Sequence, residues 1–237
     1  QEGSEFFRHL AGVGHHEVVA ESPFHNTTLA SMTADQVGLV LKAWRDRYRA
    51  LWSLPETEYV VVFKNHGQSA GCSLEHPHSQ IVSLPVIPRQ ILERHEVASR
   101  YYVQHNRCVF CAQLESELED GRRILQETQN FVAFIPYAAF SPFSIWVLPR
   151  RHSCCFGQTS EAELSELATI LQQLLARLYR RLSNPDYNLV IRSSHPEVQG
   201  KRVFHWYLTV VPRLARAAGF ELGTGMFINP STPETDC

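Results

Sequence analysis

Apolar positions that recur at three- and four-residue steps predict two long amphipathic helices. One covers residues 33–55, and the other runs from residue 160 to a break at Asn184. Each begins with a capping-box pattern, a hydroxyl residue followed three positions later by Gln36 or Glu163. A third helical pattern covers residues 90–104. Each of the two capped helices has an apolar face, which we expect to pack against a core.

Shorter runs of β-branched, aromatic and alternating residues predict strands. These runs are 15–20, 59–63, 78–84, 122–128, 130–135, 144–149, 187–192 and 202–211. A glycine-bearing loop at 65–71 joins the second and third of them. Strands and helices in this mixed order predict an α+β fold, with mainly antiparallel sheet and helices packed on it.

Histidines mark an internal repeat of this pattern. His25 and His76 are separated by about 50 residues, as are His152 and His205, and a capped helix and a strand lie within each interval. The two histidine pairs are therefore interpreted as equivalent. We expect two related units whose sheets join into a larger one.

The repeat divides the chain into a first unit, residues 1–100, and a second unit, residues 101–237. Superposing the units places Tyr207 where the first unit has His78. Only the first unit therefore keeps a histidine at this position.

Cys108 and Cys111 form a C-x2-C pair, the one pair with chelating spacing among six cysteines. With His152 and His205 they make a Cys2His2 set, the ligand types and number that tetrahedral zinc requires. The cysteine pair is expected in a loop, His152 in a loop and His205 on a strand. A reduced, buried cysteine pair with unrelated histidines is the alternative, and a redox role is less favoured because no helix is expected at the pair.

If the units are equivalent, His25 and His76 are half of a first metal site. Its cysteines would precede residue 1, if they lie as far ahead of His25 as Cys108 lies ahead of His152. A chain that is N-terminally incomplete explains this pattern, and the initial Gln1 in place of Met favours that interpretation. A first unit that never bound metal is the alternative.

The segment 76–80, His-Pro-His-Ser-Gln, opens the predicted strand 78–84. Strand alternation would place His76 and His78 on one face. Pro77 removes a backbone donor, so we expect the strand to begin or lie at an edge here, with His78 opening into a cavity. The preceding residues 65–73 are rich in glycine and hydroxyl side chains. This composition is typical of a loop whose backbone can come close to a phosphate. A purely structural histidine is the alternative.

Composition narrows the class of protein. The chain has 237 residues, 44% of them hydrophobic and 19% charged, and a formal net charge of -2. These values exclude a disordered tail or fibre and give no basic surface for a nucleic-acid polymer. No apolar run reaches the roughly 18 residues of a membrane helix, and residues 1–30 lack a secretory signal. A cytoplasmic protein without a membrane partner is expected.

The run 63–81 resembles the active-site segment of galactose-1-phosphate uridylyltransferases, a branch of the histidine-triad superfamily. Residues 21–25 and 219–226 resemble two further family motifs, so the similarity covers nearly the whole chain. The family is longer at its N-terminus and carries a further cysteine pair there. The second metal site looks most like that of plant and bacterial relatives, some of which act as ADP-sugar phosphorylases.

This resemblance implies two histidine-triad-like units and a nucleotidyltransferase. The enzyme would transfer UMP from UDP-glucose to a hexose 1-phosphate by a ping-pong mechanism through a nucleotidyl-histidine. His78 would be the nucleophile, with its other ring nitrogen donating to a backbone carbonyl near His76. Gln80 would be catalytic, donating its amide N–H to a phosphoryl oxygen.

The resemblance further implies that Asn65, Ser73 and Gln80 contact phosphate and that Glu221 accepts hexose hydroxyls. Phe220 either stacks on a ring or belongs to the core. The expected partners are a nucleotide-sugar, a sugar 1-phosphate and a second copy of the chain, and the expected cofactor is Zn²⁺. There are two alternatives. One is an ADP-sugar phosphorylase, and the other is a catalytically silent nucleotide-binding module that zinc holds together.

Overall fold

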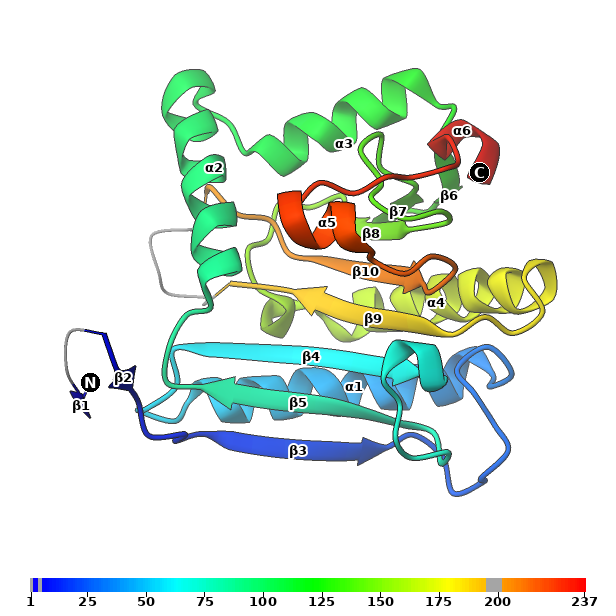
Figure 1. Cartoon of the computed structure of the whole chain (residues 1–237). Helices are drawn as coiled ribbons and strands as arrows, with labels where there is room; N and C mark the ends of the chain where they lie inside the picture. The colour runs from blue at the N-terminus through cyan, green and yellow to red at the C-terminus, as the bar shows by residue number, and fades with distance from the viewer. Residues whose placement is uncertain (1, 4–5, 195–201) are drawn as a thin grey trace.

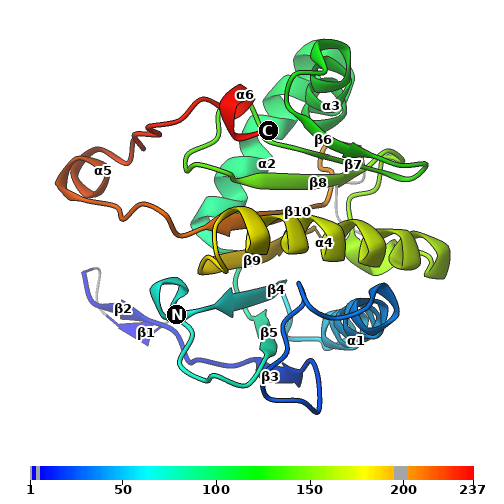
Figure 2. The same ribbon diagram turned by 90° about the vertical axis from the view of Figure 1, so that its right-hand side faces the viewer.

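One antiparallel sheet of eight strands runs through the chain in the computed structural model, which describes residues 2–3, 6–194 and 202–237. Its strand order is β3-β5-β4-β9-β10-β8-β7-β6. The helices α1 and α4 lie on one face of this sheet (Figure 2). The other face, which carries the side chains of Gln80 and Arg192, is called the open face below. The predicted α+β fold, with helices packed on a joined sheet, is confirmed.

The elements have the following bounds (Figure 1). The strands of the sheet are β3 (His15–Ala20), β4 (Tyr59–His66), β5 (His78–Leu84), β6 (Ile124–Glu127), β7 (Phe131–Phe134), β8 (Ile145–Pro149), β9 (Tyr187–Arg192) and β10 (Tyr207–Pro212). The α-helices are α1 (Ala34–Trp52), α2 (Arg89–His105), α3 (Val109–Asp120), α4 (Glu161–Arg181), α5 (Gly219–Thr224) and α6 (Pro233–Asp236). A separate two-stranded ladder joins β1 (Glu2–Gly3) to β2 (Arg8–His9). Within the described ranges, no helix combines the length and apolar character needed to cross a membrane.

The sheet has two similar halves that meet at β4 and β9. Moving outward from this central pair gives β4, β5, β3 on one side and β9, β10, β8 on the other. The register pairs Val62 with Ile191 across the seam. His78 begins β5 and Tyr207 begins β10, so the two positions superposed by the sequence repeat occupy equivalent places.

The core lies between the sheet and the helices α1 and α4. Both predicted capping boxes are present, at Thr33 and Ser160. Trp44 of α1 is fully buried, and its indole N–H donates to the Ser79 hydroxyl of β5 at 2.6 Å. Burying a large apolar side chain contributes roughly 1.5–3 kcal/mol, so this layer anchors the strands that carry the candidate site.

Two strands differ by several residues from their predicted bounds, one because a tertiary hydrogen bond replaces the ladder and one because the ladder continues. The strand predicted at 202–211 begins only at Tyr207. The N–H of Trp206 donates instead to the carbonyl of Ser153 at 2.8 Å. His205 therefore lies in a loop and not on a strand. In the other direction, β4 extends beyond residue 63 to His66.

The helices α3, α5 and α6 were not predicted. The first follows Cys108, which is its N-cap residue, so the cysteine pair opens a helix and not a loop. Its buried side chains Phe110, Leu114 and Glu117 recur at helical spacing. The helix α5 is only six residues long and has no buried residue, so no apolar periodicity could indicate it.

Candidate active site and metal centre

His78 is held in one tautomer at the start of β5. Its Nδ1 lies 2.9 Å from the carbonyl oxygen of His76. Because a carbonyl only accepts, Nδ1 carries the proton, and Nε2 of the neutral ring keeps its lone pair. The residue is 7% exposed. The backbone acceptor expected near His76 is thus present, although His76 itself precedes the strand.

His78 and Gln80 point to the open face of the sheet. Ser79 between them faces α1 through its hydrogen bond with Trp44, and side chains alternate along a strand. On the open face, the Gln80 carbonyl oxygen lies 2.7 Å from Nε2 of His16, which donates to it. This contact orients the Gln80 amide so that its N–H groups point away from His16.

Asn65 belongs to the same surface. It lies two residues beyond Phe63, the partner of Gln80 in the β4–β5 ladder, and so shares the open face with His78. The Asn65 carbonyl oxygen accepts a hydrogen bond from the Asn188 amide at 2.9 Å. The Asn65 amide N–H groups are therefore the part of this side chain available to a ligand.

The loop after β4 is braced by residues of β9 and the turn before it. The Ser69 backbone N–H donates to the Asp186 carboxylate at 2.6 Å, and the Asn188 amide donates to the Ala70 carbonyl at 2.9 Å. Gly67 has a φ of 82°, and a Cβ at this position would lie 1.7 Å from an Asp186 oxygen. Sequence reasoning missed Asp186 and Asn188, because their partners lie more than a hundred residues away.

A buried ion pair lies behind His78. The Lys64 ammonium donates to the Glu21 carboxylate at 2.7 Å and to the His78 carbonyl at 3.0 Å. The side chains of Lys64 and Glu21 are 2% and 0% exposed. This pair was also missed. Lys64 lies on the same face of its strand as the buried Val60 and Val62, and this alternation indicates a lysine that faces the core.

Two further predicted substrate residues, Ser73 and Glu221, lie on exposed segments. Ser73 is exposed, and in the part of the chain that the structure describes no hydrogen bond joins it to His78 or Asn65. Glu221 lies on α5, which projects from the second half of the sheet, away from β5 (Figures 1 and 2). The N–H of Ala218 donates to its carboxylate at 2.9 Å and lowers its pKa. Phe220 is 47% exposed and is not a core residue.

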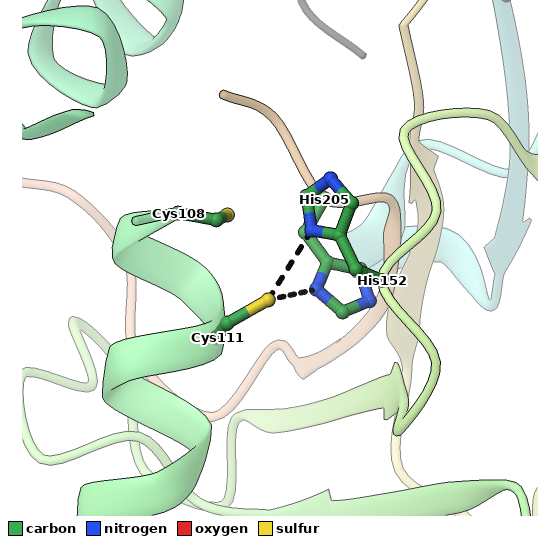
Figure 3. A group of neighbouring side chains, drawn as sticks. All are labelled: Cys108, Cys111, His152 and His205. Carbon is green, nitrogen blue, oxygen red and sulfur yellow. Dashed lines mark hydrogen bonds between the residues drawn. The ribbon is translucent and has the colours of Figure 1, made fainter. Parts of the chain in front are cut away.

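The four side chains predicted as a metal site converge on one point (Figure 3). The Cys111 sulfur lies 3.2 Å from Nδ1 of His152 and 3.4 Å from Nδ1 of His205. One ligand atom from each of these residues and Cys108 lies within 4.8 Å of all the others. Two ligand atoms of a tetrahedral zinc ion with sulfur and nitrogen ligands are about 3.3–3.8 Å apart. The donor set and its spacing therefore fit a metal ion of this kind.

The two cysteines of the cluster share one readily lost proton. A hydrogen bond from the Cys111 thiol lowers the pKa of Cys108, with His152 and His205 acting in the same direction. The Cys108 thiolate raises the pKa of Cys111 in turn. Burial lowers the pKa of His205, which favours its neutral imidazole. Three of the four groups therefore favour the form that ligates a metal, and metal binding would displace the proton of Cys111.

The first histidine pair has nearly the same ring separation as the second, although its rings are tilted and those of the second pair are T-shaped. The ring centroids of His25 and His76 are 5.4 Å apart, against 5.2 Å for His152 and His205. Nε2 of His76 donates to the Ser22 carbonyl at 2.8 Å, so Nδ1 keeps a lone pair and faces Nδ1 of His25 at 3.3 Å. Within residues 2–3, 6–194 and 202–237, the Cys108 cluster is the only place where three or more possible metal ligands converge.

The fold and these two clusters define an α+β protein of two similar sheet halves. His78 is held in one tautomer at the start of β5, and a Cys2His2 cluster in the other half could hold a metal ion. The sequence matches two family descriptions in order, galactose-1-phosphate uridyl transferase N-terminal domain at residues 1–88 and C-terminal domain at residues 94–224. The chain belongs to the galactose-1-phosphate uridylyltransferase family.

Known relatives carry two different activities. An ADP-glucose phosphorylase of Arabidopsis thaliana is 34% identical over 96% of this chain. A galactose-1-phosphate uridylyltransferase of Thermotoga maritima is 31% identical, again over 96% of the chain. The crystal structure of an Arabidopsis thaliana ADP-glucose phosphorylase with bound ADP-glucose matches 94% of this chain with a TM-score of 0.87 and 34% identity.

The chain is shorter than these relatives. It spans 64% of the Arabidopsis thaliana enzyme, 74% of the Thermotoga maritima enzyme and 70% of the crystallised chain.

Proposed function

We propose that the chain is a nucleotidyltransferase that moves UMP from UDP-glucose to a hexose 1-phosphate through a covalent intermediate on His78. The observation that supports this most is the hydrogen bond from Nδ1 of His78 to the His76 carbonyl, which leaves Nε2 as a nucleophile. The chain's membership of a family of such transferases agrees with it.

The proposed reaction has two displacements at one phosphorus atom. Nε2 of His78 attacks the α-phosphorus, the bond from that phosphorus to the bridging oxygen breaks, and the sugar 1-phosphate leaves. The positive charge on the uridylylated ring is stabilised at Nδ1–H by the His76 carbonyl. A phosphate oxygen of the incoming hexose 1-phosphate then attacks the same phosphorus and releases the His78 ring.

We assign supporting roles to the neighbouring polar side chains. Gln80 and Asn65 donate amide N–H groups to phosphoryl oxygens, because their carbonyl oxygens already accept from His16 and Asn188. Ser73, whose side chain is exposed in the loop before β5, is assigned to the same phosphate.

Glu221 is assigned to the hexose hydroxyls of a site on a second copy of the chain. Its helix α5 projects away from β5, and neighbouring Leu222 and Met226 are 80% and 64% exposed. Exposed apolar side chains on a projecting segment support contact with a partner, so we propose a homodimer.

We propose zinc as the ion at Cys108, Cys111, His152 and His205. Two thiolates and two imidazoles are typical of structural zinc, which would supply a cross-link between α3 and the loops before α4 and β10. His25 and His76 would contribute to a first site of the same kind. We retain the proposed division into units 1–100 and 101–237, which the similar sheet halves support. No disulfide joins the cysteines in the described part of the chain, which supports a cytoplasmic location.

An ADP-sugar phosphorylase is the second candidate function. It would use the same His78 chemistry, but with an adenylyl group and inorganic phosphate as the acceptor. The relative of Arabidopsis thaliana at 34% identity favours this candidate.

The test is covalent labelling with UDP-glucose or ADP-glucose that carries ³²P in the α-phosphate. We expect one acid-labile label per chain from the correct donor, and its release by hexose 1-phosphate for a transferase or by phosphate for a phosphorylase. His78→Asn should abolish the label without changing the metal content. His105→Asn, an exposed histidine on α2, is the matched control and should label normally. A wild-type chain that binds both nucleotide-sugars without labelling would contradict the proposal and indicate a silent binding module.

A further inference from the structure

A cavity opens on the second half of the sheet, on the same open face as His78. Its volume is about 640 Å³, and its lining residues come from α2, α3, β9 and the segments that carry Phe140 and Phe227. Among the residues that line it are Arg94, Arg192, Phe110, Phe140 and Phe227. None of these residues has a role in the proposed reaction.

This cavity occupies the place that the His78 surface occupies in the first half. Arg192 of β9 pairs directly with Tyr207 of β10, so their side chains share a face. The repeat places Tyr207 at the position of His78. In the first half, the register that pairs Phe63 with Gln80 brings Asn65 opposite His78. In the second half Arg192 is opposite Tyr207, so Arg192 takes the position of Asn65. The nucleophile and its neighbour are thus replaced by a phenol and a guanidinium group.

The cavity carries excess positive charge. Arg94 donates to the Tyr207 hydroxyl at 3.0 Å, and no hydrogen bond or ion pair to Arg192 is present within residues 2–3, 6–194 and 202–237. The one carboxylate that lines the cavity, Glu93, is paired with Arg89 at 2.8 Å. Two guanidinium groups without a carboxylate partner are suited to phosphate, which they can bind through parallel N–H donors.

The wall of the cavity offers aromatic surface. Phe140 and Phe227 have ring centroids 5.3 Å apart and are 43% and 55% exposed. Phe110 of α3 is buried against Tyr207, with ring centroids 5.3 Å apart. The exposed rings lie beside the two arginines. They would stack on the planar base of a ligand whose phosphate is bound by these arginines.

We propose that this cavity is a second nucleotide site, which binds a nucleoside phosphate through Arg94, Arg192 and the Phe140–Phe227 wall and does not turn it over. The identification of the ligand as a nucleotide rests on the proposed function of the equivalent His78 surface. The lack of turnover follows from Tyr207, since a buried neutral phenol bonded to Arg94 is a poor nucleophile at phosphorus.

The test is equilibrium dialysis of the full chain with radiolabelled UMP and AMP, with ribose 5-phosphate and inorganic phosphate as competitors. We expect two nucleotide sites per wild-type chain. Arg192→Gln should weaken one of them by about 10- to 100-fold, the loss expected for a charge-assisted phosphate contact. Arg192→Lys should retain part of the affinity, and Arg100→Gln, an exposed arginine elsewhere on α2, should retain all of it.

Several outcomes would overturn this inference and leave the proposed function intact. One is a single nucleotide site in every variant, with normal His78 labelling. Another is inorganic phosphate competing as well as AMP, which would exclude a role for the aromatic wall. A third is a change of sedimentation coefficient in Arg192→Gln, which would make the cavity an interface between copies. If Arg192→Gln unfolds, Arg94→Gln and Phe227→Ala provide the same comparison, and loss of His78 labelling in folded Arg192→Gln would instead place Arg192 in the reaction.

Discussion

The Lys64 ammonium lies 2.7 Å from the Glu21 carboxylate, and the two side chains are buried together beneath the start of β5. Removing one partner of such a pair leaves a buried charge without compensation. Lys64→Met should therefore lower the free energy of unfolding by about 3–5 kcal/mol, measured by urea denaturation. The double variant Lys64→Met/Glu21→Leu should recover part of that loss, because it leaves no buried charge.

Lys42→Met is the matched control, since Lys42 pairs with Glu161 at 3.0 Å on the surface. Its loss should be at most about 1 kcal/mol. Equal losses for the buried and exposed pairs would contradict the structural role assigned to Lys64 and Glu21.

Gly67→Ala should damage the loop after β4 for two reasons. Its φ of 82° disfavours a side chain, and the new Cβ would collide with the Asp186 carboxylate. Such strain should lower the free energy of unfolding by about 1–3 kcal/mol, and the displaced loop should slow His78 labelling. Gly71 has a φ of 84° but free space, with its nearest neighbour at 3.9 Å, so Gly71→Ala should have the smaller effect. A larger effect at Gly71 would show that Asp186 does not crowd this loop.

Asn188→Asp should separate binding from chemistry at the proposed active site. The substitution removes the amide donors to the Asn65 and Ala70 oxygens and leaves the His78–His76 contact untouched. Each lost hydrogen bond costs about 0.5–1.5 kcal/mol, so KM for the nucleotide-sugar should rise by roughly tenfold, with a smaller change in kcat. Steady-state kinetics test this, and a selective loss of kcat would contradict a positioning role for Asn188.

Stability should fall in mild acid because of His66. Burial lowers the pKa of its imidazole, which stacks on Tyr187 and contacts Asn184 at 3.0 Å. The unfolded chain therefore takes up this proton at higher pH than the folded chain does. The contribution of neutral His66 is complete above the unfolded value of 6.5 and is lost as the pH falls toward the lower folded value.

Urea denaturation from about pH 7.5 to about pH 5.5 measures this effect. The difference in free energy of unfolding between the wild type and His66→Phe should decrease as the pH falls. A difference that is constant across this range would contradict the assignment.

Cys111→Ser should remove the proposed zinc ion and destabilise the second half of the sheet. Cys111 contacts both histidines of the cluster, so its loss opens the site. A loss of about 3 kcal/mol would lower Tm by roughly 6–12 °C in a chain of this size. Metal analysis by mass spectrometry and thermal unfolding test this together. Cys237→Ser, which changes an exposed thiol outside the cluster, should leave both values unchanged.

The strands and long helices could be predicted because their signals are local. The alternation in residues 187–192 gave the bounds of β9, and Thr33 and Ser160 marked the starts of α1 and α4. The same alternation placed His78 and Gln80 on one face. These features depend on neighbouring residues alone, so a single sequence contains them.

Features that depend on distant partners could not be predicted. Trp206 leaves the ladder because Ser153 accepts its N–H, and Asp186 acts on a loop more than a hundred residues earlier. Lys64 was visible as a charge at an inward position, but the sequence did not show that Glu21 neutralises it. The α3 helix was a missed local signal, since Phe110 and Leu114 have helical spacing.

The ladder between β4 and β9 has a consequence for the evolution of this chain. Separated at that ladder, each half would expose a bare strand edge that includes Val62 or Ile191, and such edges recruit other strands and aggregate. A gene divided between the two halves would therefore encode two fragments that tend to aggregate. The ladder therefore favours keeping both halves on one polypeptide, whatever chemistry each half carries.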